Sequence, residues 1–129
     1  MKKLIAGLML SAMAVGCLAG CNGAGSGKKK VGVSMPTKDL QRWNQDGANM
    51  EEKLKAAGYD VDLQYASNDV ATQLSQVENM ISSGCSVLVI AAIEGSSLGT
   101  ALDKAEQKKI PVIAYDRLLM DSADRKSVV

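Results

Sequence analysis

The side chains best suited to chemistry gather in one short stretch. Residues 36–47, PTKDLQRWNQDG, contain Lys38, Asp39, Arg42 and Trp43. A pyranose or furanose stacks its C–H faces on an aromatic ring, and its hydroxyls form paired hydrogen bonds with charged planar groups. Such charge-assisted, bidentate hydrogen bonds are stronger than neutral ones. This stretch therefore predicts a site for a small polar ligand. A lone Trp at a helix start is also often a core residue, and that alternative stays open.

A second charged pair, Asp116 and Arg117, follows the apolar run VIAY. The aspartate can accept hydrogen bonds from two hydroxyls, and the guanidinium of the arginine beside it can donate two parallel hydrogen bonds. An internal ion pair is the alternative reading. If both stretches follow strands of one sheet, they meet at one edge and favour a shared polar-ligand site.

Composition argues against most other activities. The 129 residues include no histidine, which removes the commonest general base and most transition-metal sites. No Gly-x-Ser-x-Gly or phosphate-binding glycine loop occurs, so we expect a binding protein, neither an enzyme nor a protein with a cofactor or metal. With 15 Lys+Arg against 14 Asp+Glu the net charge is +1, and no nucleic-acid partner is predicted.

The elements that must position these residues can be read from periodicity. Four apolar, β-rich runs, at residues 31–35, 59–66, 87–92 and 111–116, recur at roughly the 30-residue spacing of a strand-helix-strand unit. Between them the apolar residues follow a helical period. Continuous apolar strands alternating with amphipathic helices predict an α/β fold, a Rossmann-like doubly wound parallel sheet of four strands and three helices.

Turn and cap residues agree with this order. Gly58 and Gly84 stand where the first and second helices should end. Asn68 or Asp69 is a plausible N-cap for the second helix, and Ser96 or Ser97 for the third. Pro111 can begin the fourth strand but cannot continue a helix.

The N-terminus has the layout of an export signal. Residues 1–20 run from a basic start through an apolar segment to LAG, directly before Cys21. The tetrapeptide LAGC resembles the bacterial lipobox, which implies acylation of Cys21 and anchoring in the lipid bilayer on the extracytoplasmic face. Cys17 is a weaker candidate for the acylated cysteine. Residues 21–30 then form a flexible tether, and Cys85, left without a partner, is expected to be a small buried residue.

These motifs together resemble a known family. KKKVGVSMPTKDLQRWNQDG, DLQYASNDVATQLSQVENMISSGCSVLVIAAIEGSSLG and IPVIAYDRLLM are similar to the N-terminal lobe of periplasmic sugar-binding proteins, above all the xylose-binding and multiple-monosaccharide-binding types. The resemblance implies that Arg42 and Trp43 bind and stack a sugar and that Asp116 and Arg117 bond its hydroxyls, with Lys38 a weaker candidate. It also implies two lobes that close on the ligand and an ABC permease as the membrane partner.

Length sets this chain apart from the family. Residues 31–123 correspond to an incomplete N-terminal lobe, and residues 124–129, DRKSVV, are the translation of a common sequencing-library adapter. We therefore expect a truncated gene with a non-native tail. The leading prediction is capture of an aldopentose or aldohexose, xylose-like, for import; the alternative is a sugar-sensing partner of a chemoreceptor or sensor kinase.

Overall fold

The computed structural model describes residues 27–117. The predicted signal sequence, Cys21, most of the tether and the predicted tail lie outside the described residues. Inside them, the elements follow the predicted order. They are β1 (Lys30–Met35), α1 (Gln41–Ala56), β2 (Asp60–Tyr65), α2 (Val70–Ser82), β3 (Val87–Ile90), the 3₁₀ helix η1 (Gly95–Leu98), α3 (Gly99–Gln107) and β4 (Val112–Ala114).

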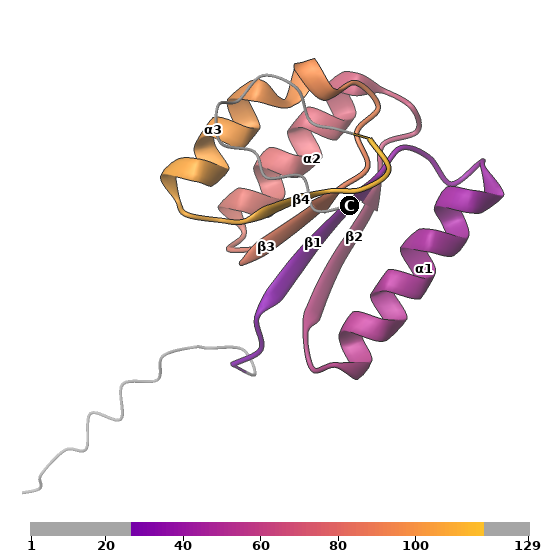
Figure 1. Ribbon diagram of the computed structural model, residues 1–129, viewed down its shortest axis with the longest axis vertical. Coiled ribbons are helices and arrows are strands. Elements are labelled where there is room, and N and C mark those ends of the chain that lie inside the picture. The colour runs from indigo at the N-terminus through magenta and orange to yellow at the C-terminus, as the bar shows by residue number, and fades with distance from the viewer. Residues whose placement is uncertain (1–26, 118–129) are drawn as a thin grey trace, which may run out of the picture.

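The strands form one parallel sheet in the order β2-β1-β3-β4 (Figure 1). Val33 of β1 is in register with Leu63 of β2 on one side and with Val89 of β3 on the other. The chain thus moves outward from β1 to β2 and then returns across β1 to β3 and β4. This reversal of strand order marks the position where open α/β sheets bind ligands, outside the carboxyl ends of the strands.

Helices cover both faces of the sheet, with α1 on one face and α2 and α3 on the other (Figure 1). Leu88 of β3 and Met80 of α2 are fully buried in the cluster on the α2 and α3 face. Val33 of β1 and Trp43 of α1 belong to the cluster on the opposite face. Two apolar layers on one sheet confirm the predicted doubly wound α/β fold.

The helix ends explain how the chain turns between layers. Each of the three helices ends with backbone N–H groups bonded to carbonyls three and five residues back, the arrangement of a Schellman motif. The left-handed residue of that motif is Gly58 after α1 (φ 94°) and Gly84 after α2 (φ 85°), as predicted, but Lys109 after α3 (φ 56°). Asp69 caps α2, and its side chain accepts a bond from the Thr72 N–H at 2.6 Å.

The predicted N-cap of the third helix is wrong. Neither Ser96 nor Ser97 caps α3, because residues 95–98 close into η1 and α3 begins only at Gly99. The Ser97 hydroxyl donates to the Glu94 carbonyl at 2.7 Å, the reverse of a capping bond. The third and fourth strands are also shorter than predicted, so residues 91–92 and 115–116 lie beyond the strands, at the edge where the candidate site forms.

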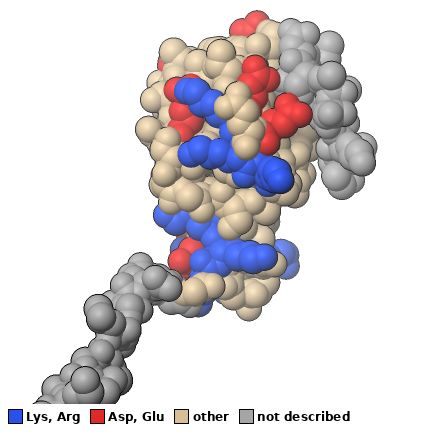
Figure 2. Space-filling model, turned by 90° about the vertical axis from the view of Figure 1, so that its left-hand side faces the viewer, with Lys and Arg blue, Asp and Glu red and all other residues tan. Residues whose placement is uncertain are grey.

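Cys85 is 2% exposed at the entry to β3, which confirms its predicted packing role. Burial raises the pKa of its thiol, and the hydrogen bond with Ser83 opposes that shift. On the face shown in Figure 2, Lys and Arg side chains lie beside Asp and Glu side chains, so charge there is mixed in sign. Between residues 27 and 117, no helix is long and apolar enough to cross a membrane.

Candidate functional site

The predicted site residues Arg42 and Asp116 meet at the carboxyl edge of the sheet. Arg42 lies in the first turn of α1, and Asp116 follows β4, 74 positions away in the sequence. The Arg42 Nη2 atom is hydrogen-bonded and ion-paired to Asp116 Oδ1. The side chains are 60% and 26% exposed, so the pair stays open to solvent. Bonding to Asp116 is the main cause that raises the pKa of Arg42, which therefore stays cationic.

A tight backbone turn orients Asp116 and Arg117 after β4. Asp116 has a φ of 64°, in the left-handed region that favours glycine. The Arg117 N–H donates to the Tyr115 carbonyl at 2.7 Å, an i to i+2 bond that closes a γ-turn around Asp116. A non-glycine residue held in this conformation stores backbone strain, and such strain clusters at functional sites.

The Arg117 side chain is held by backbone carbonyls that follow β3. Its Nη1 atom donates to the Ala92 carbonyl at 3.3 Å and to the Ile93 carbonyl at 3.1 Å. These two bonds use one nitrogen of the guanidinium, which has five N–H donors in all. Arg117 remains exposed, so its other donors can serve a ligand.

Sequence reasoning missed a second layer of this network. Asp46, one turn after Arg42 on α1, has Oδ2 3.7 Å from Arg42 Nε and accepts a hydrogen bond from the Tyr115 hydroxyl at 3.0 Å. Burial raises the pKa of Tyr115, and the bond to Asp46 adds to that rise, so the hydroxyl stays a donor. The spacing of Arg42 and Asp46 on a helix was the available signal, because residues four apart share a face.

Trp43 lies beneath Arg42. It is 5% exposed and packs in the cluster that includes Val33 and Met35. The Arg42 guanidinium carbon lies 4.8 Å from the centre of the indole ring, within the range of a cation–π contact. This placement favours packing and support of Arg42, and the predicted stacking of a sugar on Trp43 stays a prediction.

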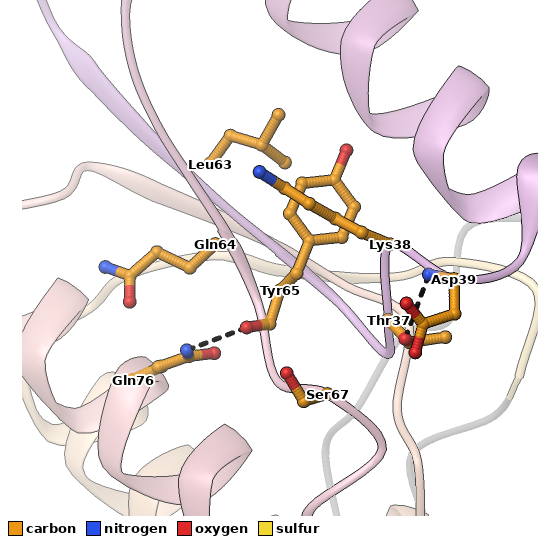
Figure 3. Close-up of a pocket in the computed structure, with 8 residues that line it drawn as sticks. All are labelled: Thr37, Lys38, Asp39, Leu63, Gln64, Tyr65, Ser67 and Gln76. Carbon is orange, nitrogen blue, oxygen red and sulfur yellow. Dashed lines mark hydrogen bonds between the residues drawn. The ribbon is translucent and has the colours of Figure 1, made fainter.

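Lys38 points toward β2, on the side of β1 away from β3 and β4. Its Nζ atom lies 5.1 Å from the ring centre of Tyr65 on β2, whereas Asp116 and Arg117 follow β4. There it lines a polar hollow of about 380 Å³, together with residues 37, 39 and 63–65 and with Ser67 and Gln76 (Figure 3). The structure therefore does not bring Lys38 into the cluster of Arg42, Asp116 and Arg117.

No group of three His, Cys, Asp or Glu residues within the described range could hold a metal ion. The site consists of one cation and one carboxylate bonded to each other, a second cation held on backbone carbonyls, and a supporting Asp–Tyr pair. Such an arrangement can donate and accept hydrogen bonds at the edge of an α/β sheet. Its position at the carboxyl edge, where strand order reverses, makes it the candidate polar-ligand site of this doubly wound sheet.

Comparison with known proteins gives the family. Residues 31–129 match the periplasmic binding protein domain, and the chain belongs to that family. It is 54% identical over 97 residues to the multiple sugar-binding periplasmic receptor ChvE of Rhizobium radiobacter, a match that covers 75% of this chain and 27% of the relative. It is 38% identical to the D-xylose-binding periplasmic protein of Escherichia coli, over 72% of this chain and 28% of that protein.

A solved relative supports the same placement. The chain is 74% identical to an ABC transporter solute-binding protein of Clostridium phytofermentans with bound β-D-glucose, with a TM-score of 0.72. That match covers 74% of this chain and 29% of the solved chain. The chain thus spans about a third or less of the length of these relatives.

Proposed function

We propose that this chain is the N-terminal part of an extracytoplasmic substrate-binding lipoprotein that captures a monosaccharide for an ABC importer. The observation that carries the proposal is the meeting of Arg42 and Asp116, with Arg117 adjacent, at the carboxyl edge of the sheet. The family and the sugar-binding names of its relatives support the ligand class. Several solved relatives are described as solute-binding proteins of ABC transporters, which favours import over sensing.

The geometry suits a sugar hydroxyl. A hydroxyl both donates and accepts, so it can accept from Arg42 and donate to Asp116 at once. Insertion between the two would replace their direct bond by two charge-assisted bonds and leave neither charge unpaired. Arg117, fixed on the Ala92 and Ile93 carbonyls, would add donors beside them. Binding is then the whole activity, and no bond in the sugar is broken.

The sugar is an aldohexose or aldopentose in this proposal, because relatives are described with glucose and with D-xylose. Calorimetry on the full-length receptor, titrated with D-glucose, D-xylose, D-ribose and L-arabinose, would test it. We expect saturable heat with at least one of them. Absence of heat with all four would overturn the sugar assignment.

Variants would then test the residues. Arg42→Ala, Asp116→Asn and Arg117→Ala should each weaken binding by roughly tenfold to a hundredfold, the effect of losing a hydrogen bond to a charged group. Lys55→Ala is the matched control, because Lys55 also lies on α1 and pairs with Glu51 at 2.6 Å, near the other end of the helix. Unchanged affinity in Arg42→Ala would refute the role given to Arg42.

The anchoring part of the proposal concerns Cys21 and rests on the sequence LAGC. Acylation there would hold the protein to the membrane that contains its permease. Cells fed radiolabelled palmitate should label the wild-type protein and not Cys21→Ser. Equal labelling of both would exclude Cys21 as the lipidated residue.

A further inference from the structure

Gln73 is an amide buried where an apolar residue would be expected. It lies on the face of α2 that packs on the sheet and is 0% exposed. Its Nε2 atom donates to Ser34 Oγ and to the Ala91 carbonyl, both at 3.0 Å. Its Oε1 atom accepts from the Ile93 N–H at 2.9 Å. A buried polar group is costly unless bonded, so these three bonds are specific features of the site.

The partners of Gln73 lie beyond the regular sheet. β3 ends at Ile90, and the backbone groups of Ala91 and Ile93 belong to the loop before η1. The Gln73 side chain bonds to one carbonyl and one N–H group of this loop, those of Ala91 and Ile93. It also links the loop to Ser34 on β1. The side-chain amide of Gln73 therefore satisfies backbone groups of the loop that would pair with a neighbouring strand if β3 were longer.

The same loop holds Arg117. The carbonyls that accept from Arg117 Nη1 belong to Ala92 and Ile93, and Gln73 bonds to Ala91 and Ile93. The Ile93 N–H that donates to Gln73 and the Ala92 carbonyl that accepts from Arg117 belong to the same peptide unit, so the two side chains bond to opposite sides of it. A shift of the loop would move the acceptors of the guanidinium directly.

We propose that Gln73 is a positioning residue for ligand binding: it fixes the carbonyls after β3 that orient Arg117 at the carboxyl edge of the sheet. The proposal rests on the proposed sugar-binding function. Gln73 itself touches no ligand in this account. A purely structural role, in which Gln73 only sets how α2 packs on the sheet, is the competing explanation.

A double-mutant cycle separates the two roles. In the full-length receptor, Gln73→Met keeps an unbranched side chain of similar volume but removes all three hydrogen bonds. With D-glucose and D-xylose as probes, we expect Gln73→Met to weaken binding roughly tenfold, the effect of misplacing one charged donor. In the Arg117→Ala background the same change should have little further effect, because Arg117 is the group that Gln73 positions.

Gln76→Met is the matched control. Gln76 lies one turn further along α2, and its Nε2 atom donates to the Tyr65 carbonyl at 3.0 Å, on the β2 side of the sheet. This variant should lower stability without changing sugar affinity. Circular dichroism would confirm that each variant is folded at the assay temperature. If Gln73→Met does not fold, Ser34→Ala removes one anchor of Gln73 with little change in volume and should show a smaller loss, again absent in the Arg117→Ala background.

The outcomes are distinct. If Arg117→Ala binds weakly while Gln73→Met, or Ser34→Ala in its place, binds like the wild type, the positioning role is refuted and the sugar site stands. Equal losses in the wild-type and Arg117→Ala backgrounds would also refute it. If the wild type binds no sugar, the proposed function itself has failed.

Discussion

Gly47 of α1 is buried against side chains of β2, and replacing it by alanine tests that packing. A Cβ atom at this position would collide with the Tyr65 hydroxyl oxygen and would lie 3.2 Å from Leu63 Cδ1. In a helix interior, alanine is normally favoured over glycine by about 1 kcal/mol. The collision works against this gain, because overpacking a core costs about 1–3 kcal/mol.

We therefore expect Gly47→Ala to lower the free energy of unfolding by up to about 2 kcal/mol, the difference between these two effects. The Tyr65 hydroxyl oxygen is the atom that the new Cβ would meet first, so removing it tests whether this collision causes the loss of stability. Tyr65→Phe removes that oxygen, whose own hydrogen bond to the Asn44 carbonyl is long at 3.4 Å. In the Tyr65→Phe background the nearest contacts of the new Cβ become about 3.1–3.2 Å, so most of the loss should disappear.

Urea unfolding of the proposed full-length protein, followed by circular dichroism, would measure these differences. Gly99→Ala is the control: Gly99 begins α3 with a helical φ of −48°, and nothing lies within 4 Å of its Cβ position. It should be neutral or stabilising. If Gly47→Ala stabilised the protein as much as Gly99→Ala does, or if Tyr65→Phe failed to rescue it, the close approach of α1 would not be the reason for the glycine.

Two further predictions concern helix ends. Lys109→Gly should raise the free energy of unfolding by about 0.5–1 kcal/mol, because the left-handed conformation at φ 56° penalises a side chain; Lys108→Gly, at φ −88°, should lower it. In urea titrations, a loss of stability in Lys109→Gly would contradict this account. Hydrogen bonds from Thr72, from its side chain first and then its backbone, lower the pKa of Asp69 below its ordinary value of 3.8. The stability that Asp69 contributes should thus be full above pH 3.8 and lost as pH falls through the lower folded-state pKa. The stability gap between wild type and Asp69→Ala should close in acid, and a gap that stays constant with pH would contradict the capping role.

The fold was predictable because its signals are local and repeated. Continuous apolar strands, helical stripes and the glycines at 58 and 84 each indicate the same alternation, and the structure confirms the order. Sequence reasoning failed at η1, because two serines before a helix look like caps whether or not a 3₁₀ turn intervenes. That turn depends on tertiary contacts, with Leu98 fully buried in the core.

The residues of the candidate site could be predicted from the sequence, but their geometry only in part. Position after a strand was enough to place Arg42, Asp116 and Arg117 at one edge. The γ-turn at Asp116 could not be predicted, because nothing in its residue type requires a positive φ. Gln73 was also missed, since a glutamine on a helix is usually exposed, and only the three-dimensional position of the loop after β3 shows what it bonds.

The ion pair between Arg42 and Asp116 also has a consequence for the order of folding. Joining two points 74 residues apart in a flexible chain costs about 4 kcal/mol or more in lost conformational entropy. A solvent-exposed ion pair is too weak to supply this. The pairing of β1 with β3 and of β3 with β4 must therefore come first, and the charged groups meet only once those strands are in register. During synthesis the proposed ligand site would thus be among the last features of residues 27–117 to form, and early sugar binding could not guide the folding of this region.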